Sequence, residues 1–325
     1  FNNRVRSTTD YYKKKTTDLL YSVAVPATSG YQTMLKNIGS IENQGYELSI
    51  ESDNLTGPFS WTTAFNISFN RNKVLELGGE DYKEMAEGDG HIKTGSVRRL
   101  IAGEPIGVFY GYRFDGIFQN EEECKQQTSS ASPIGVGLRR YKDLNGDGKV
   151  DAANDREILG DANPKFFGGL TNTFAYKGFE LNVFLQYSYG NKILNYNAME
   201  LENPTGGQNA YADMVNRWTP ENPSNIYPKA TTNRAILASD RFIEDGSYLK
   251  LKTLSLSYSF PKINMKHIQG LRLYVTGQNL LTWTKYRGYD PEVSYRGAST
   301  LEAGEDFGGY PQSRTFMFGV KLDIK

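Results

Sequence analysis

The sequence predicts an all-β fold, an antiparallel up-and-down barrel whose strands cross a membrane. Three observations support this prediction: long runs of alternating apolar and polar residues, aromatic residues near the ends of those runs, and connections of two very different lengths. A strand places successive side chains on opposite faces, so each run has one apolar and one polar face. Barrel strands show their lipid side only at every second residue.

The clearest run is FSWTTAFNISFNRNKVLEL, at 59–77, where Phe59, Trp61 and Phe65 share one parity and small polar residues occupy the other. Runs of roughly 9 to 13 residues suit a tilted strand that crosses a bilayer and exceed the usual five or six. After a strand-like start, alternation predicts strands at 43–53, 58–71, 166–176, 178–190, 247–260, 271–283 and 313–324.

The connections separate into two classes, which is typical of outer-membrane barrels with short inner turns and long extracellular loops. Residues 54–58, 176–178 and 261–270 predict the short turns. The segment 106–142 allows two interpretations: it crosses the membrane twice, through 107–118 and 134–142, or it forms a hairpin that stays outside. We therefore expect nine or ten strands. The long loops are predicted at 18–42, 73–105, 143–165, 191–246 and 284–312.

The composition excludes several function classes. Lys and Arg together number 37, as do Asp and Glu, so no net charge favours nucleic acid. One cysteine and two histidines leave no disulfide framework, thiolate zinc cluster or histidine-rich metal site. We find no paired carboxylates on a rigid scaffold, nucleophile elbow or metal triad, so the sequence does not predict an enzyme.

Five segments resemble, in order, the barrel of SusC/RagA-type TonB-dependent transporters. They are NIGSIENQGYELSI (37–50), FSWTTAFNISFNRNKVLEL (59–77), GVFYGYRFDGIFQ (107–119), and the stretches at 141–191 and 247–292. The resemblance implies the C-terminal portion, 1–325, of a 22-stranded barrel whose plug domain and TonB box lie outside this chain.

The resemblance also implies a function and partners. Such transporters import bulky nutrients, oligosaccharides or peptides, across the outer membrane of Gram-negative bacteria. The expected partners are a SusD-like surface lipoprotein, the TonB complex acting through the missing N-terminal part, the rest of the barrel with its plug, and the ligand. A dimer of transporter–lipoprotein pairs is expected, and no cofactor is required.

A soluble carbohydrate-binding or surface-adhesion β protein is the alternative. It requires the apolar rows to be buried against a second sheet. The polar rows carry charges such as Glu180 and Arg272, which cost little in a water-filled lumen but much in a packed core. This composition favours the barrel.

The stretch DLNGDGKVDAAND, at 143–155, has the spacing of an EF-hand loop, in which alternate oxygen ligands and a glycine turn hold calcium. Position 12 is Asn154 instead of glutamate, so the last ligand is left to Asp155. A structural Ca²⁺ that stiffens the loop is one interpretation, and a polar turn without metal is the other. The candidate ligands are Asp143, Asn145, Asp147, the Lys149 carbonyl, Asp151 and Asp155.

Two long loops, 195–223 and 283–311, mix aromatic residues with arginine, acids and amides. Aromatic rings can stack on sugar faces while amide, acid and guanidinium groups bind hydroxyls. The alternative is that these side chains pack within their own loops or against the lipoprotein. The candidate ligand-binding residues are Trp218, Tyr286, Arg287, Tyr289, Asp290 and Tyr295.

Overall fold

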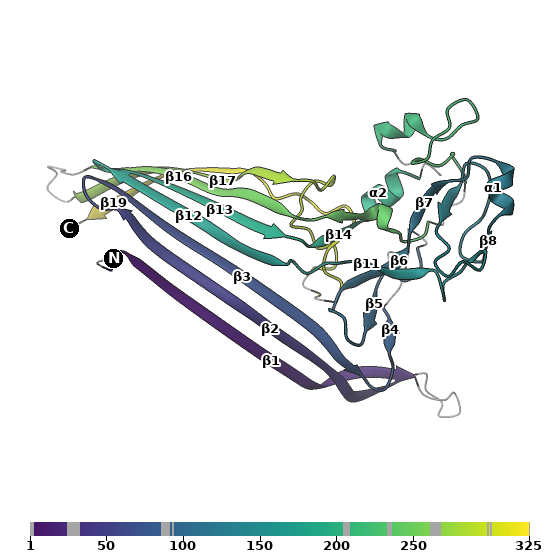
Figure 1. Cartoon of the computed structure of the whole chain (residues 1–325). Helices are drawn as coiled ribbons and strands as arrows, with labels where there is room; N and C mark the ends of the chain where they lie inside the picture. The colour runs from purple at the N-terminus through teal and green to yellow at the C-terminus, as the bar shows by residue number, and fades with distance from the viewer. Residues whose placement is uncertain are drawn as a thin grey trace.

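The computed structural model describes residues 3–24, 33–85, 92, 94–203, 209–232, 236–260, 268–297, 299 and 301–324. Its main feature is one antiparallel sheet of eight long strands, in which each strand pairs with its neighbours in chain order (Figure 1). The strands are β1 (Val5–Ala24), β2 (Thr33–Leu55), β3 (Phe59–Leu77), β12 (Phe166–Tyr176), β13 (Phe179–Tyr189), β16 (Tyr248–Ser259), β17 (Ile268–Thr284) and β19 (Thr315–Ile324).

The expected count of nine or ten strands is wrong for the described sheet, because 106–142 does not cross with the others. Its β6 (Val108–Tyr112) pairs with β11 (Arg156–Asp161), and β7 (Phe114–Ile117) pairs with β9 (Arg139–Tyr141). These short ladders occupy the backbone groups that a barrel strand would need. Four of the five residues of β6 are buried, without the alternation of a lipid-facing strand. The interpretation with two crossings is therefore wrong for the described sheet.

The loop predicted at 18–42 is also corrected. β1 and β2 continue to pair through it, from Leu19 opposite Gly39 to Ala24 opposite Thr33. Similarly, β3 reaches Leu77 and pairs with β2 there. The backbone ladder therefore extends these strands beyond the alternating runs. The other predicted strands agree with the structure within a few residues at each end.

Three insertions replace the predicted long loops between strands. The first insertion (78–165) also holds β4 (Tyr82–Glu84), β5 (Arg99–Ile101), α1 (Glu121–Lys125), β8 (Thr128–Ser129) and β10 (Lys149–Val150). The second (190–247) holds β14 (Lys192–Asn195), α2 (Tyr196–Leu201), two 3-10 turns (Ala212–Asn216 and Asp240–Phe242) and β15 (Ile243–Asp245). The third (285–314) holds β18 (Glu305–Asp306). No helix in the described part of the chain is long and apolar enough to span a membrane.

The insertions lie at one end of the sheet, and both chain termini lie near the other (Figure 1). At the terminal end, the β12–β13 turn has positive φ at both Lys177 and Gly178, 46° and 90°. A two-residue hairpin with this geometry matches the twist of its strands. Residues 261–267 of the third predicted short turn lie outside the described residues.

The apolar row of the sheet is exposed. Leu181 lies opposite Leu256, which lies opposite Val275 and then Phe318. Leu256 is 45% exposed and Phe318 82%. The remaining sheets among the described residues have two or three strands and belong to the insertions, so no second sheet of this part covers the row. The condition set by the soluble alternative is therefore not met.

The opposite row carries paired charges, as a wet interior requires. Arg272 of β17 reaches across β16 and donates to Glu180 of β13 at 2.6 Å and to Ser257 at 2.7 Å. Both charged side chains are about 40% exposed. Such a pair contributes little stability, but it places the charges together on the face opposite the apolar row.

Candidate functional site: the loop assembly

The largest buried cluster of the described residues lies in the insertions. Phe109 comes from the first insertion, and Leu194, Met199 and Phe242 come from the second; all four are fully buried. Phe307 of the third insertion packs against the same cluster. Because each insertion contributes apolar surface that the others cover, the three fold as one unit. We call this unit the loop assembly.

A buried ion pair joins the first and third insertions. Arg98, 1% exposed, donates from Nε to Glu305 at 2.7 Å and from one terminal nitrogen to the Gly107 carbonyl at 2.7 Å. Its guanidinium also lies 4.2 Å from the centre of the Phe109 ring. A guanidinium with several partners tolerates such burial, so Arg98 fixes the position of β18.

A second buried charge joins the second and third insertions. Glu202 is fully buried, and Arg241 donates to its Oε2 at 2.7 Å while Arg287 donates to its Oε1 at 2.9 Å. Arg287 also donates to Glu244 at 3.0 Å. Burial alone would lower the pKa of Arg287, but the hydrogen bonds to the two carboxylates outweigh it and raise that pKa. The predicted ligand residue Arg287 therefore holds the loop assembly together.

The third insertion is also tied to the polar row of the sheet. Lys250 of β16, 1% exposed, donates to Asp290 and to Glu292, each at 2.6 Å. Lys252 donates to Glu292 at 2.8 Å. Burial would raise the pKa of both carboxyls, but the Lys250 ammonium lowers them below their ordinary values. Asp290, another predicted ligand residue, thus serves as an anchor.

Tyr286 is buried, and its hydroxyl donates to Asp306 of β18 at 2.5 Å. Burial, followed by the hydrogen bond and the charge of Asp306, raises the pKa of Tyr286, so the phenol stays protonated. The two other aromatic candidates of this insertion are exposed, unlike Tyr286. Tyr289 is 81% exposed. Tyr295 is 40% exposed, and its ring meets the Phe307 ring edge-on with 5.4 Å between the ring centres.

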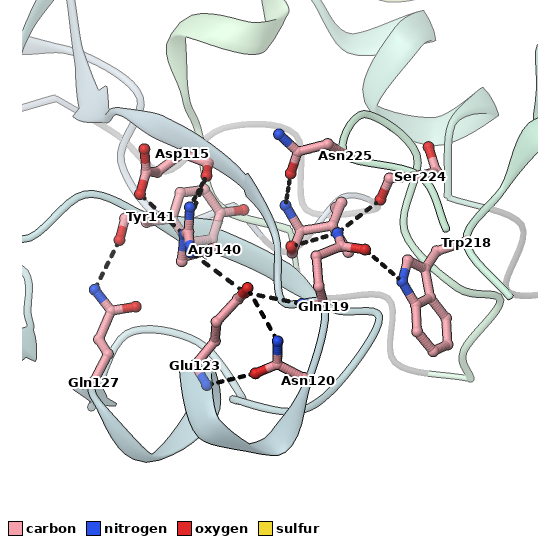
Figure 2. A network of polar contacts seen from close by, with 11 residues as sticks. Asp115, Gln119, Asn120, Glu123, Gln127, Arg140, Tyr141, Trp218, Ser224 and Asn225 are labelled. Atoms are coloured by element: carbon pink, nitrogen blue, oxygen red, sulfur yellow. Dashed lines mark hydrogen bonds and ion pairs between the residues drawn. The ribbon is translucent and has the colours of Figure 1, made fainter. Parts of the chain in front are cut away.

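Trp218 lies at the joint between the first and second insertions (Figure 2). Its indole donates to Gln119 Oε1 at 3.1 Å, and the amide of Gln119 donates in turn to the carbonyls of Ile117 and Ser224. A Cβ on Gly137 would lie 2.6 Å from the Trp218 ring. The ring therefore packs against bare backbone, and Trp218 is separate from the five other candidates, which belong to the third insertion.

The predicted calcium loop forms a chain of side-chain-to-backbone turns. Asp143 accepts from the amides of Gly146 and Gly148, each at 2.7 Å, and Asp147 accepts from the Lys149 amide at 2.8 Å. Asp155 is fully buried and accepts from the Leu144 and Asp151 amides.

Among the described residues, no three His, Cys, Asp or Glu side chains are grouped so as to hold a metal ion. These hydrogen bonds match the polar turn. Each carboxylate keeps further lone pairs, so calcium stays a prediction.

Sequence reasoning missed the buried charges Arg98, Glu202 and Glu305. No local pattern identifies them, since their partners are distant in the sequence. Lys250 could have been found, because it shares the parity of the apolar Leu254 and Leu256 in SYLKLKTLSLSYSF. A register shift between Leu251 and Thr253 places it on the polar face instead.

No family model matches the chain. Among curated proteins, it is 40% identical over 99% of its length to TonB-dependent receptor P3 of Formosa agariphila, of which it covers 32%. It is 29% identical over 99% of its length to TonB-dependent receptor SusC of Bacteroides thetaiotaomicron, of which it covers 30%.

Among solved structures, the RagAB peptide transporter superposes with a TM-score of 0.77 at 25% identity, over 99% of this chain and 34% of that one. The chain thus spans about a third of the length of the curated relatives it matches. With the eight-stranded sheet and its loop assembly, these similarities show that the chain belongs to the SusC/RagA type of TonB-dependent receptors.

Proposed function

We propose that this chain is the C-terminal portion of a 22-stranded outer-membrane barrel that imports bulky nutrients in a Gram-negative bacterium. Its sheet is open at β1 and β19. An edge strand presents unpaired backbone groups that must be covered or paired, which supports pairing with further strands of the same barrel. On this proposal the chain contributes wall and outer loops, and it does no covalent chemistry.

The exposed apolar row carries this proposal. Side chains such as Phe179 and Phe318, 52% and 82% exposed, would be costly to leave in water but suit acyl chains. The Glu180–Arg272 pair on the other face suits a water-filled lumen. The sheet thus has the two unlike surfaces that a membrane channel wall requires.

The cargo that we propose is an oligosaccharide or a peptide, captured with a SusD-like lipoprotein and moved with energy from TonB. A relative named SusC and a neighbour named as a peptide transporter support this class. We place cargo contacts at the exposed Tyr289 and Tyr295, and we expect two transporter–lipoprotein pairs to associate.

Uptake in cells with and without TonB tests the import mechanism. We expect uptake of the growth-supporting glycan or peptide to stop without TonB, while the purified full-length protein still binds it. Uptake that continues at the same rate without TonB would refute active import. Loss of binding as well would instead indicate a misassembled receptor.

Extraction behaviour tests the barrel independently of any cargo. The full-length protein should need detergent and should migrate at a different apparent mass before and after heating. A protein that disperses in water and shows no heat-dependent shift would support the soluble binding protein instead.

A further inference from the structure

A cavity of about 170 Å³ lies between the first and second insertions. Arg139, Ser132 and Tyr141 line it from the first insertion, and Asn203 and Leu237 line it from the second. The wall thus combines one cation, hydroxyl and amide groups, and apolar surface. Nothing in the proposed import mechanism uses this cavity.

Arg139 has no ion-pair partner among the described residues. One terminal nitrogen donates to the Glu202 backbone carbonyl at 3.1 Å, while its Nε is buried without a partner. No carboxylate of the described residues lies within ion-pair distance of its guanidinium. The Glu202 carboxylate attracts this charge, but its side-chain hydrogen bonds come from Arg241 and Arg287.

A guanidinium that leaves water needs its donors satisfied and its charge balanced. Burial lowers the pKa of Arg139 and Arg241 lowers it further, while Tyr141 and Glu202 partly offset this effect. Arg139 is only partly buried, whereas Arg98 of the loop assembly is 1% exposed and has the Glu305 carboxylate as its partner at 2.7 Å. Among the described residues, Arg98 thus has a carboxylate at ion-pair distance and Arg139 does not.

We infer that the Arg139 cavity is a binding site for a small carboxylate. A planar carboxylate matches the fork of a guanidinium and can accept two hydrogen bonds from it. The volume suits a carboxyl group on a short carbon body, which would meet Leu138 and Leu237, while Ser132 and Asn203 supply further polar groups. A tetrahedral anion such as sulfate would gain nothing from the apolar wall.

The carboxylate can come from a free acid or from an acidic residue of a bound protein, which share this chemistry. In either case the ligand would contact both insertions and so stabilise the loop assembly.

Thermal unfolding of the full-length protein in detergent tests the site, with sodium propionate compared with sodium chloride and sodium sulfate at matched ionic strength. Propionate should raise the melting midpoint more than either control salt. Arg139→Gln should abolish that difference. Arg140→Gln is the matched control, since Arg140 is the next residue but pairs with Asp115 at 2.9 Å and Glu123 at 3.4 Å (Figure 2); this variant should keep the difference.

The proposal is overturned if propionate and chloride act alike on the parent protein, or if Arg139→Gln keeps the propionate effect. If Arg139→Gln does not fold, a second variant, Ala131→Phe, fills the cavity with a larger side chain. Saturation-transfer NMR then compares propionate binding to the parent protein and to Ala131→Phe. Equal saturation transfer to propionate from both proteins would overturn the proposed site. A propionate effect in the isolated receptor and in its assembled complex indicates a free acid. An effect that disappears on assembly indicates that a partner's acidic residue takes the site.

Discussion

The Nζ of Lys250, on the polar face of β16, lies 2.6 Å from the carboxylate of Asp290 in the third insertion. Both side chains are almost completely buried, and Glu292 lies equally close to the same ammonium. This contact joins an outer loop to the barrel wall, so the loop is held over the polar face of the sheet.

Replacing Lys250 by methionine should release the third insertion. Asp290 would stay buried without its cation, which costs about 3–5 kcal/mol. Lys252→Met is the control, because Lys252 is more exposed and its ion pair in the described part of the chain is with Glu292, worth about 0–1 kcal/mol. Limited proteolysis within 285–314 and thermal unfolding measure the effect. Equal protection of the loop in both variants would contradict the anchoring role of Lys250.

The same contact should respond to acid. The folded-state pKa of Asp290 and that of Glu292 are lowered from their ordinary values of 3.8 and 4.5. Their stabilisation is therefore fully present above those ordinary values and is lost as the pH falls below them, through the lowered values. Proteolysis of 285–314 with an acid-tolerant protease should accelerate in that window for the parent protein. Lys250→Met, which has already lost the contact, should show a weaker pH dependence.

Gly168 of β12 should not tolerate alanine. An added Cβ would collide with the Asn66 backbone oxygen and lie 2.7 Å from the Tyr187 hydroxyl, which donates to that same oxygen at 2.8 Å. We expect a loss of about 1–3 kcal/mol from overpacking. Tyr187→Phe removes only the hydrogen bond, so it should lose about 1 kcal/mol.

Gly135→Ala is the control, because its nearest neighbour would be Leu138 Cδ1 at 3.4 Å. Thermal unfolding in detergent compares the three variants. A Gly168→Ala protein as stable as Gly135→Ala would show that β3 and β12 can separate without cost.

Calcium should raise the melting temperature of the parent protein if the 143–155 loop binds it. The double variant Asp143→Ala, Asp147→Ala should lose that dependence because two of the proposed ligands are gone. Asp115→Ala controls for the removal of a surface acid from the same insertion. Identical melting temperatures of the parent protein with calcium and with chelator would reject the calcium site and support the interpretation as a polar turn.

The strands were predictable because their signal is local. The alternation in 166–176 and in 254–260 follows directly from one face meeting an apolar medium and the other meeting water. The ends of β1 and β2 were not predictable in this way. Outside the alternating runs, the backbone pairing from Leu19 to Ala24 continues the two strands.

The loop assembly was much less predictable. Composition identified the stretches that hold Tyr286, Arg287 and Asp290, but not that these side chains bind other parts of the same chain. Their partners Asp306, Glu202 and Lys250 are 20 to 85 residues away in sequence. Such contacts arise from the folded arrangement of three insertions, which no periodicity encodes.

The two-residue parallel ladder between β14 and β18 pairs Leu194 with Glu305 and Asn195 with Asp306. Since its strands come from different insertions, neither insertion can be exchanged between receptors without breaking a ladder that the other completes. Chimaeras that exchange a single insertion should therefore misfold in the loop assembly. An exchange of all three insertions together should keep the buried contacts among them. Changes of cargo during evolution would then proceed by altering outward-facing side chains on a retained frame.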